Sequence, residues 1–323
     1  MNDLNKRTNS FSLPSRWWSL LAVIAIVLGL ACSLAIAKER IRKPAVAGSF
    51  YPKDQEALKK TVDTSLLNVK QEQIEGKILG LISPHAGYVY SGQVAAYSYR
   101  QIKDKNYDTV IIIGPSHRVY LRGASVGNWD AYATPLGKVA VNKEMVNGLL
   151  SMGKPFHFVR EAHIREHSVE TQIPFLQRVL KNFDIVPIVM GMPSLTDCER
   201  ISEALSKIVG KRNVLFVASS DMSHFPDYGN ATRVDRETLS LIEKFDPKLV
   251  FNSEAESLAK GIPRLSTTLC GLSSVVTVMM TVRQLGGNGA KILHYANSGD
   301  VAIHGYQEKR RVVGYGAVAL YKK

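Results

Sequence analysis

Three side chains offer ligands for a transition metal: the imidazoles of His85 and His117 and the thiol of Cys270. Two imidazoles and a thiolate suit zinc, copper or iron. Their spacing along the chain is uninformative, and a histidine behind a strand is more often an ordinary polar loop residue. Position favours the metal interpretation, because each histidine follows an apolar run that ends in Ser83-Pro84 or Gly114-Pro115. We predict that His85, His117 and Cys270 bind a metal.

A third apolar run, 214–218, is followed closely by Asp221 and His224. A carboxylate and an imidazole in such a place act as general acid and base, or hold a ligand imidazole in one tautomer. The plain alternative is that Asp221 caps a turn. We predict that Asp221 and His224 are catalytic residues beside the metal.

A second pair of histidines, His163 and His167, is spaced by four residues. Glu166 does not occupy the position of the base in a His-Glu-x-x-His zinc motif, and His167 precedes the helix that Ser168 is expected to cap. We therefore expect His167 and Glu170 to line the wall of a pocket rather than to bind metal.

Cys270 also allows a different chemistry. We expect a helix over 266–285 with Cys270 in its first turn or two, and a helix amino end can lower the pKa of a thiol. A metal-independent hydrolase that uses Cys270 with a histidine therefore stays open. The sequence lacks a Gly-x-Gly-x-x-Gly motif behind a strand, a phosphate-loop lysine and a Gly-x-Ser-x-Gly elbow, which argues against nucleotide-dependent chemistry and serine hydrolysis.

Alternating apolar runs and amphipathic segments predict an α/β fold. It is a single domain with a central, mostly parallel sheet flanked by helices, and the ligand site lies at the carboxyl ends of the strands. A hairpin excursion is expected between 118 and 142. The expected strands are 78–82, 109–113, 184–190, 214–218, 291–297 and 311–321. The expected helices are 54–67, 92–102, 143–152, 168–180, 195–209, 234–245, 247–258 and 266–285.

The first 37 residues differ from the rest of the chain. The run 17–37 is almost wholly apolar and is long enough to cross a bilayer. Ala35-Ile36-Ala37 resembles a signal peptidase site, and Cys32 lies in a loose lipoprotein-like box. We expect a signal peptide or membrane anchor over 1–37 and one domain over 38–323, membrane-anchored or exported, with the membrane as a partner if the segment is uncleaved.

The net charge of +13 does not by itself indicate nucleic-acid binding. The lysines and arginines are scattered along the chain, and no stacking motif accompanies them. We expect no nucleic-acid partner. The expected ligand is a small molecule or a peptide in the cleft.

Six separated motifs together resemble the Memo family, described in prokaryotes as protein B of the AmmeMemoRadiSam system. The resemblance covers essentially all of 43–321. It implies a fold similar to class III, LigB-type extradiol dioxygenases and partners from the same system. It also places His85, His117 and Cys270 at metal-binding positions, with Asp221 and His224 beside them. The motifs are Ala47-Gly48-Ser49-Phe50-Tyr51-Pro52, Ser83-Pro84-His85-Ala86-Gly87-Tyr88, Gly114-Pro115-Ser116-His117, His167-Ser168-Val169-Glu170, Ser219-Ser220-Asp221-Met222-Ser223-His224 and Thr268-Leu269-Cys270-Gly271.

Two positions qualify what the resemblance implies. Phe50 stands where some members have Trp, so an aromatic wall is retained without its indole donor. The third iron ligand of the dioxygenases is a carboxylate, whereas Cys270 is a soft thiolate that alters metal preference and redox behaviour. We expect iron or copper, with zinc as a further option, and dioxygenase-like redox chemistry on a substrate that the sequence does not identify. The alternatives are a non-catalytic module that holds a peptide or partner in the cleft, and the Cys270 hydrolase.

Overall fold

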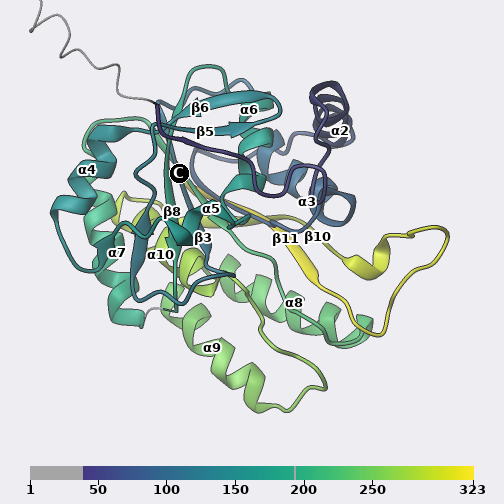
Figure 1. Cartoon of the computed structure of the whole chain (residues 1–323). Coiled ribbons are helices and arrows are strands. Elements are labelled where there is room, and N and C mark those ends of the chain that lie inside the picture. The colour runs from purple at the N-terminus through teal and green to yellow at the C-terminus, as the bar shows by residue number, and fades with distance from the viewer. Residues whose placement is uncertain (1–38, 193) are drawn as a thin grey trace, which may run out of the picture. The chain divides into compact units, whose positions relative to one another are not determined.

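The computed structural model describes residues 39–192 and 194–323, and Arg40–Lys323 form one compact unit (Figure 1). Its centre is an eight-stranded sheet in the order β10-β11-β2-β9-β3-β8-β4-β7. These strands are β2 (Lys77–Ser83), β3 (Thr109–Pro115), β4 (Ala124–Val126), β7 (Phe156–His157), β8 (Asp184–Met190), β9 (Val214–Ser219), β10 (Gly289–Asn297) and β11 (Gly314–Lys322).

The four middle strands of this sheet, β2, β9, β3 and β8, run parallel. Ile111 of β3 pairs with Phe216 of β9 on one side and with Val186 of β8 on the other. Every residue of β3 is buried, as expected for a parallel strand covered on both faces. The outer strands β11, β10 and β4 are added antiparallel. The predicted α/β fold with a mostly parallel central sheet is thereby confirmed.

Two groups of helices flank the sheet (Figure 1). In one group α10 packs on β9, β2 and β3 and is covered by α7 and α9. In the other, α3 packs on β2, β10 and β11 beside α2 and α6. The helices are α2 (Gln55–Leu67), α3 (Tyr88–Arg100), α4 (Lys143–Ser151), α5 (Glu161–Ile164), α6 (Ile173–Val179), α7 (Leu195–Val209), α8 (Tyr228–Glu243), α9 (Pro247–Ala259) and α10 (Leu272–Gln284).

The segment between β3 and α4 forms the expected hairpin over part of its length. Strands β5 (Ala131–Thr134) and β6 (Gly137–Ala140) pair antiparallel, and the short β1 (Ile41–Arg42) adds to β5 in a separate three-stranded sheet. Strand β4, from the same excursion, joins the large sheet instead.

Two helix boundaries near the predicted site differ from expectation. Helix α10 begins at Leu272, so Cys270 lies in the turn before it. Thr267 pairs with His224, and the N–H of Cys270 donates to the carbonyl of Asp221, which keeps this segment out of the helix. The expected Ser168 cap is also absent, because the Ser168 hydroxyl donates to the carbonyl of Pro115.

The expected membrane anchoring or export is corrected by the structure. Within residues 39–192 and 194–323, no helix is long and apolar enough to cross a membrane. The segment 17–37, on which the expectation of a signal peptide or membrane anchor was based, lies outside the described residues.

Candidate metal centre

The carboxyl ends of three neighbouring parallel strands bring the predicted site residues together. His85 follows β2, His117 follows β3, and Asp221 follows β9. The segment that carries Cys270 lies against the end of β9, where a side chain on Gly271 would approach the Ser219 carbonyl to 2.6 Å. Glycine at this position therefore allows the turn with Cys270 to reach the edge of the sheet.

His85 is buried, and hydrogen bonds fix both its ring and its backbone N–H. Its Nδ1 lies 2.9 Å from the Ser219 hydroxyl, and its backbone N–H donates to Asp221 at 2.8 Å. Its Nε2 is left to face the Cys270 sulfur at 3.2 Å. Burial, together with His117, His167 and His224, lowers the pKa of His85 well below its usual value. The neutral imidazole is the form that binds metal.

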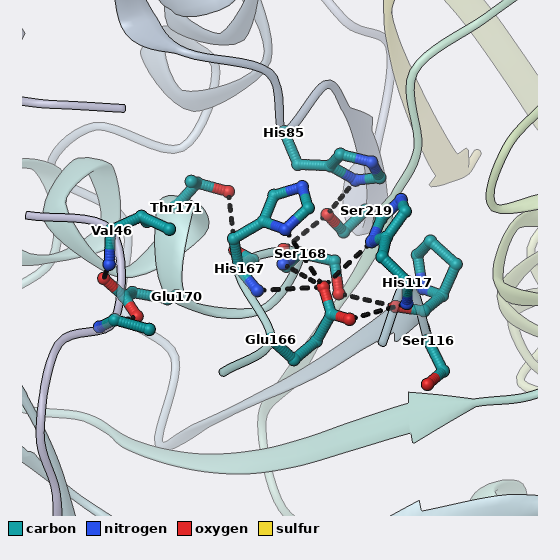
Figure 2. Close-up of polar contacts among 12 residues, drawn as sticks. Val46, His85, Ser116, His117, Glu166, His167, Ser168, Glu170, Thr171 and Ser219 are labelled. Carbon is teal, nitrogen blue, oxygen red and sulfur yellow. Dashed lines mark hydrogen bonds and ion pairs between the residues drawn. The ribbon is translucent and has the colours of Figure 1, made fainter. Parts of the chain in front are cut away.

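His117 is oriented by a carboxylate that the sequence analysis discounted (Figure 2). Its Nδ1 lies 2.9 Å from Glu166, and its backbone N–H donates to the same carboxylate at 2.7 Å. Glu166 also accepts the backbone N–H groups of His167 and Ser168, at 2.8 and 2.9 Å. Although burial alone would raise the pKa of Glu166, its hydrogen bonds to His117 and its charge interactions with His117 and His167 lower it. A carboxylate behind a ligand histidine is a common way to fix its tautomer.

The segment with Glu166 approaches the end of β3 closely. A side chain on Gly114 would meet the Ser168 hydroxyl at 2.5 Å, so only glycine permits this contact. Sequence reasoning had no signal for Glu166, because its role comes entirely from this contact between 166–168 and a strand about 50 residues earlier in the chain.

His167 lies inside the cluster and is more than a wall residue. Its ring stacks on His117 with centroids 4.4 Å apart and meets the ring of His85 edge-on at 5.4 Å. Its Nδ1 lies 3.3 Å from Glu166 without a hydrogen bond of acceptable geometry, and this buried nitrogen has no other partner. Burial lowers the pKa of His167 to about 4. The expected aromatic wall is present, since Phe50 packs against the His167 ring at 4.7 Å.

Asp221 links His85 to the predicted acid–base pair. One carboxylate oxygen accepts the backbone N–H groups of His85 and Ala86, and the other lies 3.8 Å from His85 Nε2 and 3.9 Å from His224 Nε2. Burial raises the pKa of Asp221 and lowers that of His224. The buried Nε2 of His224 has no hydrogen-bond partner.

The thiol of Cys270 is enclosed by the same groups. Its sulfur accepts the backbone N–H of Asp221 at 3.2 Å and faces His85. Burial, reinforced by the charge of Asp221, raises the pKa of Cys270 well above its usual value. A bound cation would offset this burial and favour the thiolate.

The described residues contain two groups whose donor atoms lie within 4.8 Å of one another: His85 with His117 and His167, and His85 with Asp221 and Cys270. His117 and Cys270 thus fall in different groups, each shared with His85. A cleft of about 740 Å³ opens onto His117, His224 and Cys270. Its apolar lining includes Val119, Leu121, Phe251, Leu258, Leu269 and Leu272.

Glu170 does not reach this centre. In Figure 2 it lies apart from the imidazoles, near Val46. It forms a buried ion pair with Arg42 and accepts the Tyr51 hydroxyl and the N–H groups of Ala45 and Val46. We call this the Arg42 cluster; it comprises Arg42, Tyr51, Tyr132, His163 and Glu170.

Comparisons with known proteins find relatives of this chain and of its fold. The profile of a family described as Memo-like protein matches residues 42–319. MEMO1 family proteins of Methanobrevibacter smithii, Nitrosopumilus maritimus and Thermotoga sp. strain RQ2 are 36%, 34% and 36% identical to this chain. They cover 86%, 86% and 87% of it and 98%, 98% and 99% of their own lengths. The crystal structure of the uncharacterized protein JW3007 from Escherichia coli K12 superposes with a TM-score of 0.50 at 13% identity. That match covers 75% of this chain and 99% of the other, and it shows the shared fold.

Proposed function

Because this chain belongs to the Memo-like protein family, we propose that it binds a transition metal, iron or copper, in the cleft through His85, His117 and Cys270. The observation that carries the proposal is the orientation of the two imidazoles. Ser219 and Glu166 bind Nδ1 of His85 and His117, which leaves Nε2 of each ring to bind a metal, with Nε2 of His85 facing the Cys270 sulfur at 3.2 Å. Metal-binding histidines are typically fixed in this way.

The donor chemistry fits such an ion. Neutral imidazoles and a thiolate suit copper, iron and zinc, and the thiolate favours softer ions. The unpartnered nitrogens of His167 and His224 are further evidence, since buried polar atoms without partners are uncommon away from binding sites. A redox-active ion bound here would supply one-electron chemistry and Lewis-acid activation.

The chain's own residues would then position a substrate beside the metal. The largely apolar walls of the cleft bind an apolar body and exclude water from the centre. His224 lines the same cleft, and its free Nε2 is the group placed to exchange a proton with a bound molecule. Asp221 lies 3.9 Å from the same nitrogen and stabilises the protonated imidazole. We propose a metal-dependent redox enzyme with His224 and Asp221 as its acid–base pair.

Metal analysis of protein purified without oxygen tests this proposal. We expect stoichiometric iron or copper after reconstitution of the wild type and only traces in His85→Ala. His294→Ala is the control, because this half-buried histidine stacks on Tyr97 and belongs to neither ligand group. Wild-type protein that takes up neither metal would overturn the proposal. Full copper affinity in Cys270→Ser would remove the thiolate from the ligand set.

The thiol hydrolase is less well supported by the same geometry. A nucleophilic cysteine needs a lowered pKa, whereas burial and Asp221 raise that of Cys270, which also lies before the helix and not in its first turn. The cleft itself favours the alternative of a binding module, because its apolar walls suit a peptide side chain. Turnover by the reconstituted wild type would identify an enzyme and not a binding module. In that case His224→Gln should lose turnover while its metal content stays unchanged.

A further inference from the structure

Two ligand groups overlap at His85, and they differ in chemical character. His117 and His167 complete an all-nitrogen group, whereas Asp221 and Cys270 complete a mixed oxygen–sulfur group. Since Nδ1 of His85 is hydrogen-bonded to Ser219, only its Nε2 can bind a metal, whichever group supplies the other ligands. One ion bound through His85 therefore has two alternative sets of neighbours.

His167 is held in the place that this alternative requires. Figure 2 shows its ring beside that of His117, with its far nitrogen directed toward His85. The stack on His117 and the edge contact with Phe50 fix the plane of the ring. Residue 167 is only 8% exposed, and Nδ1 makes no hydrogen bond. Neither nitrogen of this buried imidazole is therefore committed to the Arg42 cluster or to a backbone carbonyl.

On the premise that the centre binds a metal as proposed above, we propose that it has two alternative ligand sets, in which His167 replaces Cys270 for ions that prefer nitrogen. Soft Cu(I) is bound by the set proposed above, His85 with His117 and Cys270. Borderline ions such as Ni(II) are bound by His85, His117 and His167. Thiolates select soft ions and imidazoles suit borderline ones. The only covalent change is loss of the thiol proton to solvent when sulfur binds.

Binding of Ni(II) and of Cu(I), each measured under argon on the full chain, separates the two sets. The variants are Cys270→Ala, His167→Phe, which keeps the ring stack but removes both nitrogens, and the control His294→Phe. We expect Cys270→Ala to weaken Cu(I) binding and His167→Phe to weaken Ni(II) binding. Each loss of affinity should be at least the ~10–100-fold that follows removal of a residue hydrogen-bonded to a metal ligand. The affinity of each variant for the other metal, and both affinities of the control, should change by less than about threefold, well below that range.

X-ray absorption provides a second measurement that does not depend on activity. In the wild type we expect a sulfur neighbour around Cu(I) and only light atoms, with the outer pattern of imidazole, around Ni(II). Sulfur bound to Ni(II) would overturn the inference, as would equal Ni(II) affinities of His167→Phe and His294→Phe. Either result leaves the proposed metal binding intact. A wild type that binds neither Ni(II) nor Cu(I) overturns this inference, and the iron and copper analysis above decides the proposed metal binding. If His167→Phe does not fold, His167→Gln replaces it with the same expected loss.

Discussion

The segment 161–172 contributes residues to two polar clusters, which differ in how many of their buried polar atoms have hydrogen-bond partners. Glu166 bonds to His117 of the candidate metal centre, and Glu170, four residues later, belongs to the Arg42 cluster. The Arg42 guanidinium donates to Glu170 and to the carbonyls of His163 and Glu166. Both ring nitrogens of His163 are bonded, to Ser125 at 3.0 Å and Tyr132 at 2.9 Å.

The candidate metal centre, in contrast, contains buried nitrogens without hydrogen-bond partners. Among the described residues, buried nitrogens of His167 and His224 lack partners, and no atom of the Arg42 cluster does. A saturated buried network fixes one packing arrangement, whereas an unsaturated one costs stability unless something binds. Residue type and burial therefore do not distinguish the histidines of the two clusters, whereas the number of ring nitrogens with a hydrogen-bond partner does.

The largest expected effect comes from breaking the Arg42 cluster. Arg42→Met leaves the Glu170 carboxylate buried without its counter-charge, so we expect a loss of about 3–5 kcal/mol in the free energy of unfolding. Urea denaturation measures it. The matched control is Arg178→Met, whose ion pair with Asp63 is about one-third exposed and should cost less than about 1 kcal/mol. Equal losses in the two variants would show that the Arg42 pair is not structurally important.

Mutation of Glu166 should mainly weaken metal binding, whereas mutation of Glu170 should mainly lower the free energy of unfolding. Glu166→Gln removes the charge behind His117 and His167, and we expect metal affinity to fall about 10–100-fold. Glu170→Gln should leave metal affinity nearly unchanged and lower the free energy of unfolding, because Arg42 loses its counter-charge. Metal titration and urea denaturation of both variants give the comparison. If Glu170→Gln weakens metal binding as much as Glu166→Gln does, the two clusters are not separate.

His163 should make the metal-free protein less stable in acid. Burial and the charge of Arg42 lower its pKa to about 3 in the folded chain, whereas the unfolded value is about 6.5. The unfolded chain therefore binds the extra proton, and stability is complete above about pH 6.5 and lost as pH falls toward 3. The slope reaches about 1.4 kcal/mol per pH unit.

Urea denaturation between pH 7 and pH 5, with a chelator present, checks this slope. His163→Gln removes the titrating group, and its stability should fall less steeply with acid than that of the wild type. The other buried histidines titrate in both proteins, so the difference isolates His163. Parallel curves would contradict the assignment.

The smallest effect is expected at the aromatic wall. Phe50→Leu removes the edge-to-face contact with His167, and we expect a loss of about 0.5–1.5 kcal/mol beyond the lost apolar area. Thermal unfolding measures this change. Phe50→Trp should restore the contact. If the leucine and tryptophan variants are equally stable, Phe50 does not hold the ring of His167.

The sequence by itself determined the parallel strands and the side chains at their ends. Runs such as 110–113 are apolar at every position, which is a local pattern, and chain direction then places His85, His117 and Asp221 at the same edge. The helices that follow simple amphipathic spacing, such as α2 and α7, begin and end close to where they were expected.

Only the tertiary structure decided which groups meet at that edge. The roles of Glu166 and His167 depend on a contact between 166–168 and Gly114, and the start of α10 depends on bonds from the Cys270 turn to the end of β9. Glu170 was expected beside the pocket, but its partner Arg42 lies on a distant short strand. Hydrogen bonds between segments this far apart leave no periodic trace in the sequence, because they depend on where the chain returns and not on its local pattern.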